Sequence, residues 1–320
     1  MSTRNSFRPA SLLAFLPFLS LALSADTTFQ CNSQTSHMFH QDCAVAANQL
    51  ILSLTRNDGQ THIPNDDIMH TVSNCQAIVR ASGGEKTVQG SALLLSFAQV
   101  GSRCQDGTFT ESGGTISGGI KGSASWKRGN NARSIKDRTM GSIKRALSSS
   151  FRNFKRNVDM GNNLQRRGDG EMMAARKGNN GEMYRLMMVS AHGVPGLAPS
   201  SPQVNSMFFQ RSREFFQHHF TREDTSDLVF GNSYPTQGNT HVSVVTLGIK
   251  LRGGQKSWKE FVEGQKDGGK VLKQLITDGI TMFTANKFVA AYFQVLNASN
   301  SPVFSFMVYG YDSVDSPLPS

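Results

Sequence analysis

The spacing of apolar residues predicts a small folded unit in the first third of the chain. Residues 43–54 and 90–103 carry apolar side chains at steps of three and four, which predicts two amphipathic helices. Between them, residues 68–79 predict a strand, with Cys75, Ala77 and Val79 alternating onto one face. Glycine and serine dominate residues 108–125, which indicates a closing hairpin or a loose tail. This α-β-α-β order suggests two helices on one side of a small sheet.

A second patterned region follows residue 182. Strands are expected at residues 183–190, 241–251, 287–296 and 303–311, and helices at 205–220 and 258–283. Glycine is a poor helix former, so Gly264, Gly268 and Gly269 are expected to split the second helix. The predicted fold class is therefore α+β: two small α/β-sandwich domains, each with helices packed on a mainly antiparallel sheet, joined by a basic flexible linker.

The N-terminus has the three zones of a secretory signal peptide, expected over residues 1–25. Two arginines open it, an apolar run covers residues 12–23, and small side chains precede an expected cut ahead of Ala25 or Asp26. The run is shorter than the roughly 20 residues that a membrane span needs. We therefore expect a secreted, extracellular protein.

All cysteines fall in the first third of the chain, at Cys31, Cys43, Cys75 and Cys104. An even count in an oxidising compartment predicts two disulfides, and the sequence leaves three pairings open. No C-x-x-C pair is present, which disfavours a zinc site, so we expect neither a metal nor a cofactor. The expected units are a disulfide-stabilised domain at residues 26–126 and a cysteine-free domain at residues 182–320.

The formal net charge of +10 belongs to the segment between these domains. Residues 127–181, here called the basic segment, hold 14 Lys and Arg against four acids, and the remainder of the chain is neutral. Apolar residues between 135 and 158 recur among these bases, as in a basic amphipathic helix. Such a helix would bind an anionic membrane or an acidic cell-wall polymer. A nucleic acid partner is not expected for a secreted protein.

Adjacent pairs of basic residues occur in the basic segment and nowhere else in the chain. The pairs end at Arg128, Arg145, Arg156, Arg167 and Lys177. Proprotein convertases of the secretory pathway cut after such pairs in exposed, flexible chain. The pattern therefore predicts processing into two modules. The alternative is a secreted carbohydrate-binding or cell-wall-binding protein that keeps the basic segment intact.

Motifs for catalysis are missing from the sequence. None of the eight histidines lies in H-E-x-x-H, and no G-x-S-x-G, P-loop or G-x-G-x-x-G occurs, so we expect no catalytic site. His218 and His219 are expected to cover the edge of a core. Asn297, in Asn-Ala-Ser, is an acceptor for N-glycosylation at a predicted turn between two strands.

The overall organisation resembles that of fungal killer toxins and small secreted effectors. The features that carry the resemblance are the signal-like N-terminus, the dibasic segment and the domain with Cys31, Asp42-Cys43, Cys75 and Cys104. Some members of that group are made as preproproteins in which two α/β modules flank an excised segment. The resemblance implies a secreted, non-enzymatic effector or toxin-like interaction protein, directed at an extracellular or host-cell target.

Overall fold

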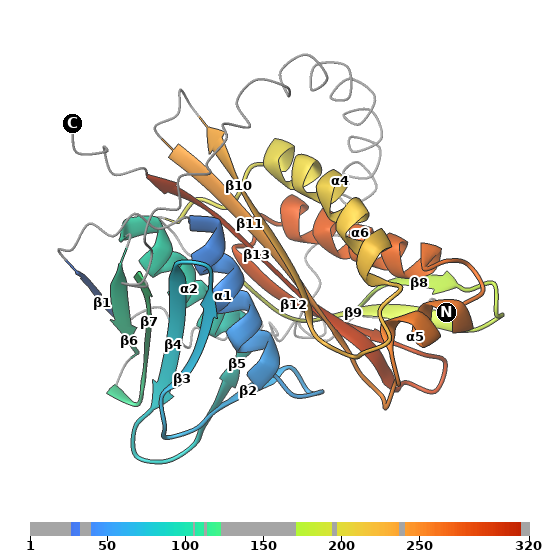
Figure 1. Cartoon of the computed structure of the whole chain (residues 1–320), viewed down its shortest axis with the longest axis horizontal. Coiled ribbons are helices and arrows are strands. Elements are labelled where there is room, and N and C mark those ends of the chain that lie inside the picture. Colours follow the sequence, from blue (N-terminus) through green and yellow to red (C-terminus); the bar gives the residue numbers. More distant parts are fainter. Residues whose placement is uncertain are drawn as a thin grey trace, which may run out of the picture.

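The fold is a stack of four alternating layers. The computed structural model describes residues 27–32, 40–104, 106–111, 114–122, 171–193, 197–236 and 241–314. Figure 1 shows, from left to right, a five-stranded sheet, two helices, a six-stranded sheet and a second layer of helices. All strand pairs in these sheets are antiparallel, which confirms the expected α+β class.

The N-terminal half supplies the first two layers. Its strands are β1 (Thr28–Cys31), β2 (Gln60–Ile63), β3 (Ile68–Val72), β4 (Cys75–Ala81), β5 (Lys86–Gln89), β6 (Gly107–Thr110) and β7 (Ile116–Gly122). Its helices are α1 (His40–Leu54) and α2 (Gly90–Arg103), at the positions that the apolar spacing predicts. The five-stranded sheet has the order β1-β6-β7-β4-β3, and β2 and β5 form a separate pair.

One predicted strand of this half proves to be a hairpin. Residues 68–79 were expected to form a single strand, but β3 ends at Val72 and β4 starts at Cys75. The chain reverses through Ser73, whose φ of 48° lies in the left-handed region used by tight turns. Burial alternates along both arms, and the turn signal in the sequence is the short pair Ser73-Asn74.

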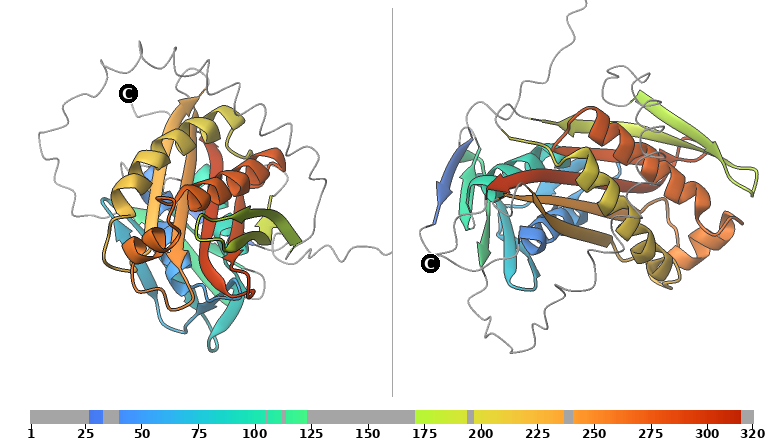
Figure 2. Two further views of the ribbon diagram at one scale, coloured as in Figure 1. Left: turned by 90° about the vertical axis from the view of Figure 1, so that its right-hand side faces the viewer. Right: turned by 90° about the horizontal axis from the view of Figure 1, so that it is seen from above.

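The C-terminal half supplies the other two layers. Its strands are β8 (Glu171–Lys177), β9 (Met183–His192), β10 (Leu228–Thr236), β11 (His241–Leu251), β12 (Ala290–Leu296) and β13 (Pro302–Val314). Its helices are α4 (Pro202–His219), α5 (Trp258–Gly264) and α6 (Lys270–Ala285). The sheet order is β10-β11-β13-β12-β9-β8. Figure 2 shows its long strands crossing behind α4 and α6.

The helices of this half start and stop where the local sequence directs. The side chain of Ser201 accepts a hydrogen bond from Val204 N ahead of α4, and Ser257 does the same for Glu260 N ahead of α5. Gly269 has a φ of 76° and separates α5 from α6. The predicted split of the segment 258–283 is therefore confirmed.

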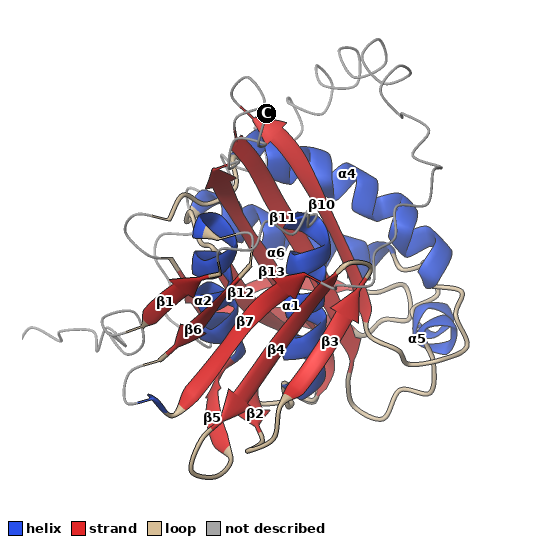
Figure 3. Ribbon diagram, turned by 60° about the vertical axis from the view of Figure 1, so that its left-hand side comes forward, coloured by secondary structure: helices blue, strands red, loops and turns tan. Residues whose placement is uncertain are grey.

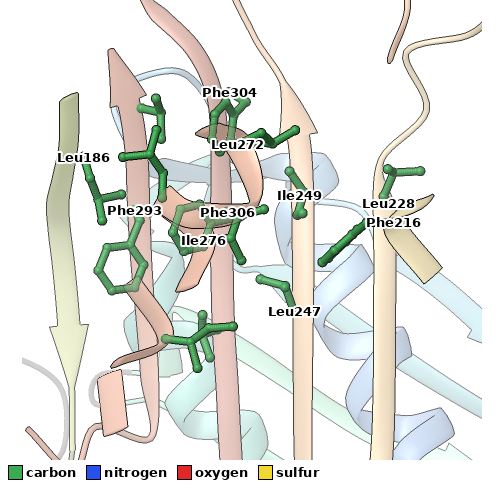
Figure 4. Close-up of a cluster of buried hydrophobic side chains, with 14 of the residues drawn as sticks. Leu186, Phe216, Leu228, Leu247, Ile249, Leu272, Ile276, Phe293, Phe304 and Phe306 are labelled. Atoms are coloured by element: carbon green, nitrogen blue, oxygen red, sulfur yellow. The ribbon is translucent and has the colours of Figure 1, made fainter. Parts of the chain in front are cut away.

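The first of two hydrophobic cores lies between the six-stranded sheet and α4, α5 and α6. Aromatic and aliphatic side chains of the sheet face Phe216 of α4 and Leu272 and Ile276 of α6 (Figure 4). On the sheet side, the ring centroids of Phe293 and Phe306 are 4.8 Å apart in a stacked arrangement. This core is made wholly by the C-terminal half.

The second core is shared by both halves of the chain. It contains α1, α2 and the inner face of the five-stranded sheet, together with Tyr292, Met307, Tyr309 and Tyr311 from the opposite face of the six-stranded sheet. Every residue of α2 from Gly90 to Gly101 is buried, as expected for a helix enclosed by two layers. The two halves therefore share one core, a contact that the sequence did not predict.

Glycines allow the halves to approach closely. A Cβ at Gly101 of α2 would lie 2.3 Å from the hydroxyl oxygen of Tyr311, and one at Gly248 of β11 would lie 2.5 Å from Asn48 Oδ1 of α1. Both distances are far below van der Waals contact. The interface is therefore fitted at the level of single atoms.

The prediction for the end of the basic segment is wrong. Residues 171–181 were expected to belong to a flexible linker, but β8 pairs along its length with β9, and residues 178–181 turn between them. Backbone pairing with β9 and burial of Met173 make β8 an edge strand of the sheet. The remainder of the basic segment, with its predicted amphipathic helix, lies outside the described residues, as does the predicted signal peptide. Among the described helices, none has the length and apolar character to cross a membrane.

Candidate functional site

A network of hydrogen bonds from two cationic side chains lies where α1 meets the six-stranded sheet. Lys250 Nζ donates to the carbonyl oxygens of Leu52 and Ser53 at 3.1 and 3.2 Å, and Arg252 Nη2 donates to that of Thr55 at 3.1 Å. These carbonyls belong to the last turn of α1 and the residue after it. Cations at this position favour a helix because the C-terminus carries partial negative charge. Two cations of the C-terminal half thus cap a helix of the N-terminal half.

Arg252 is the deepest charged group of this region. It is 7% exposed, and its Nε donates to Ser305 Oγ at 2.9 Å, while Nη2 also reaches the Tyr292 hydroxyl at 3.4 Å. No carboxylate of the described residues forms an ion pair with it; the neighbouring Asp227 pairs with Lys250 instead, at 3.8 Å. A buried guanidinium that is satisfied only by neutral acceptors depends strongly on each of them.

Burial changes the protonation chemistry of the neighbouring pair. It raises the pKa of Asp227, against the opposing charges of Lys250 and Arg252. It lowers the pKa of Lys250, against the opposing charge of Asp227. Both directions follow from removing charged groups from water. Lys250, Arg252 and Asp227, here called the helix-capping cluster, are thus held in a desolvated setting between the halves.

A polar cleft of about 730 Å³ opens beside the helix-capping cluster, lined by residues 53–58, His62, Lys250 and Arg252. His62 Nδ1 lies 2.8 Å from Glu85 Oε1 and 3.3 Å from Thr87 Oγ1. A histidine that activates a nucleophile needs that nucleophile on one ring nitrogen and an orienting group on the other. Here both contacts use the same nitrogen, and they tie β2 to β5.

The disulfides join Cys31 to Cys104 and Cys43 to Cys75, which confirms two bridges and selects one of the three possible pairings. The first ties the edge strand β1 to the end of α2. The second is buried and ties α1 to β4. Both lie in the N-terminal half, and neither bridges the two halves.

Only one of the predicted processing sites lies in the described part of the chain. Arg128, Arg145, Arg156 and Arg167 lie outside it. Lys177 is the last residue of β8, and the adjacent Arg176 donates from Nε and Nη2 to Asp278 of α6, both at 3.0 Å. The sequence suggested that this fifth pair lies in flexible chain. The structure instead places it in a strand that pairs with β9.

The acceptor asparagine lies in the turn between β12 and β13. Asn297 Oδ1 accepts hydrogen bonds from Ser299 N, Ser299 Oγ and Ser301 N at 3.1, 2.9 and 2.9 Å. Residues 298–301 are exposed. The sequon thus occupies an accessible turn, in which the Ser299 hydroxyl contacts the Asn297 side chain. Glycosylation there stays a prediction.

The two histidines of α4 behave differently. His219 stacks on Phe215 with ring centroids 4.0 Å apart, and its Nδ1 lies 2.8 Å from the Phe215 carbonyl oxygen, as expected for a histidine at a core edge. His218 is exposed. Within the described ranges, no group of three or more His, Cys, Asp or Glu side chains is arranged to hold a metal ion.

No protein-family model, curated protein or solved structure matches this chain. The resemblance to killer toxins and effectors therefore stays a prediction from the organisation of the sequence. The helix-capping cluster was not predicted, and its clearest signal in the sequence is the change from apolar residues to Lys250 and Arg252 at the end of an apolar strand.

Proposed function

We propose that this protein is a secreted, non-enzymatic effector or toxin-like interaction protein that is cut within the basic segment and acts as one particle made of both halves. The dibasic pairs and the signal-like N-terminus support secretion and processing. The two disulfides are consistent with an oxidising compartment.

The shared core is the observation that carries this proposal. A cut anywhere between residues 123 and 170 leaves α1 and α2 packed on Tyr292, Tyr309 and Tyr311. No disulfide joins the halves, so the two chains would be held by non-covalent contacts alone. Processing is then a means of activating or opening the particle, and it does not release two independent modules.

The fold also favours some cleavage sites over others. A convertase binds its substrate as an extended, unpaired chain, and β8 is paired with β9 while Arg176 is tied to Asp278. Cleavage after Lys177 would require the edge of the sheet to open. We therefore expect the last cut to follow Arg167, so that the second chain starts at Gly168.

The proposal of a non-enzymatic role draws on how the described charged groups are used. Lys250 and Arg252 donate to main-chain carbonyls of α1, and His62 and Glu85 bind each other. These contacts support structure. The partner is then an extracellular or host-cell molecule that binds the surface of the assembled particle.

Secretion of the full chain from a convertase-competent host tests the proposal. We expect two chains on denaturing gels, one elution peak at the summed mass on size-exclusion chromatography, and a second chain that begins at Gly168 by mass spectrometry. Labelled particle should bind intact target cells saturably, and excess unlabelled particle should displace it.

Matched variants separate the cleavage sites. Replacing Arg128, Arg145, Arg156 and Arg167 with Ala should yield one uncut chain, whereas Lys177→Ala should be processed like the unchanged protein. Two chains that elute separately would contradict the shared particle. An uncut secreted chain would contradict processing and favour the intact, surface-binding alternative.

A further inference from the structure

No helix of the described residues covers the outer face of the five-stranded sheet. Figure 3 shows β7, β4 and β3 on the near side of α1 and α2, which cover only the inner face. The outer face is not flat, because a hollow of about 350 Å³ crosses β6, β7 and β4. That volume lies within the range of small-ligand sites in proteins.

Glycine forms the floor of the hollow. A Cβ at Gly119, in the middle of β7, would lie 2.4 Å from the Gly107 carbonyl oxygen on β6. The position therefore cannot carry a side chain, although its cross-strand neighbours Thr108 and Ile78 do. Ile78 lines the hollow beside Gly119, so an apolar side chain and bare backbone form the floor.

Hydrogen-bonding groups surround this floor. The hydroxyls of Thr108 and Ser117 and the amino group of Lys121 have no hydrogen-bond partner within the described chain. At one end lies Asp106, which is 7% exposed and accepts from Asn32 Nδ2 at 2.5 Å and from Gly122 N at 3.3 Å. A buried carboxylate fixed by two donors is a preorganised acceptor.

The charges around the hollow cancel. Asp67 and Asp106 face Arg80 and Lys121, and Arg80 Nε lies 3.7 Å from Asp67 Oδ1. A phosphate or sulfate would meet two carboxylates, and a polycation would meet two bases, so a strongly charged ligand fits poorly. The site instead offers donors and acceptors around an apolar floor.

We propose that this hollow binds a neutral oligosaccharide. A sugar ring presents an apolar face of C–H groups and a rim of hydroxyls that both donate and accept. The first matches the floor at Gly119 and Ile78, and the second matches the rim at Thr108, Ser117 and Asp106. The proposal holds whether or not the basic segment is cut, because the hollow lies within one half.

Binding of neutral oligosaccharides to the full secreted chain tests this inference. The probes are short oligomers of β-linked glucose, β-linked N-acetylglucosamine and α-linked mannose, each titrated by calorimetry. Ser117→Ala and Lys121→Ala change exposed or half-buried side chains and should retain the fold, which a thermal melt checks. Each should weaken the tightest probe at least about five-fold, as expected when a hydrogen bond is lost.

Met69→Ala is the matched control, because Met69 is 52% exposed on the same sheet face and lies outside the hollow. It should leave affinity unchanged. Failure of all three probes to bind, equal binding by the Ser117 and Lys121 variants, or tighter binding of a sulfated oligosaccharide or an acidic peptide would each overturn the proposal. The same titration on the variant in which Arg128, Arg145, Arg156 and Arg167 are replaced by Ala shows whether sugar binding is independent of processing.

Discussion

The two large sheets are covered in different ways. The six-stranded sheet has helices on both faces, and in β12 every residue from Ala290 to Val295 is buried. Within the described part of the chain, helices cover one face of the five-stranded sheet, and β4 alternates buried and partly exposed residues. Both disulfides attach to the half with the singly covered sheet. In this chain the cross-links therefore occur in the half whose own sheet has one covered face, where they add to the stabilisation that burial supplies.

Separating the two halves of the chain should have the largest effect on stability. A fragment of residues 27–122 exposes the faces of α1 and α2 that pack on Tyr309 and Tyr311, so we expect no cooperative thermal transition. Residues 171–314 alone should bind a hydrophobic dye. Mixing or co-expressing both fragments should restore one cooperative melt. Cooperative folding of each fragment by itself would show that the shared core is a contact between independent domains.

Removing the buried guanidinium should have the next largest effect. Arg252→Met leaves Thr55 O and Ser305 Oγ without their donor, and we expect a loss of about 3 kcal/mol in the free energy of unfolding. Chemical denaturation measures this. Arg56→Ala is the control, because its side chain is 64% exposed in the same cleft, and should change stability by less than about 0.5 kcal/mol. Equal effects would show that the buried Arg252 stabilises the fold no more than an exposed arginine does.

A buried carboxyl group makes stability depend on pH through the N-terminal half. Glu111 is 4% exposed, its Oε1 has no hydrogen-bond partner in the described chain, and burial raises its pKa from 4.5 to about 7. The folded state then binds more protons than the unfolded state between these values. Stability should therefore fall by about 2–3 kcal/mol as pH rises from about 4.5 to 7.

Glu111→Gln should abolish most of this fall, raising stability at pH 7 and leaving it nearly unchanged at pH 4. Urea denaturation across this range measures it. Glu214→Gln, at an exposed position of α4, should keep the original slope. A slope that persists in the Glu111 variant would assign the pH dependence to other groups.

Adding one methyl group at the interface between the halves should have a smaller effect on stability. Gly101→Ala places a Cβ against the Tyr311 hydroxyl and should cost about 1–2 kcal/mol through overpacking. Gly264→Ala is the matched control, since a Cβ there meets nothing within 4 Å. Thermal melts of the two variants compare them directly. A neutral Gly101 variant would mean that the halves can shift apart at little cost.

Local elements were largely predictable, whereas the joining of the halves was not. The helices α1, α2, α4 and α6 follow from apolar spacing, and the strand at β11 from alternation. The strand β8 was missed because Met, Ala, Arg and Lys favour helices, and pairing with β9 overrides that preference. The strand β10 was missed because Gly231 and Pro235 are typical of turns.

The shared core and the helix-capping cluster depend on contacts across most of the chain. Lys250 and Leu52 are 198 positions apart, so no local pattern connects them. One signal was present: residues 90–102 contain no charged side chain, which is unusual for a helix with a solvent-facing side. That absence identifies α2 as a helix enclosed between layers.

The position of β13, at the end of the described chain, has a consequence for folding during biosynthesis. The helices α1 and α2 are made early, yet Met307, Tyr309 and Tyr311 of the last described strand complete their burial. The N-terminal half must therefore wait for the end of the chain, with its disulfides limiting its freedom meanwhile. A cut before β13 has docked would turn closure within one chain into an encounter between two. If the basic segment is cut as we propose, we therefore expect the cut to follow folding, because the uncut segment would keep the two partners on one chain until then.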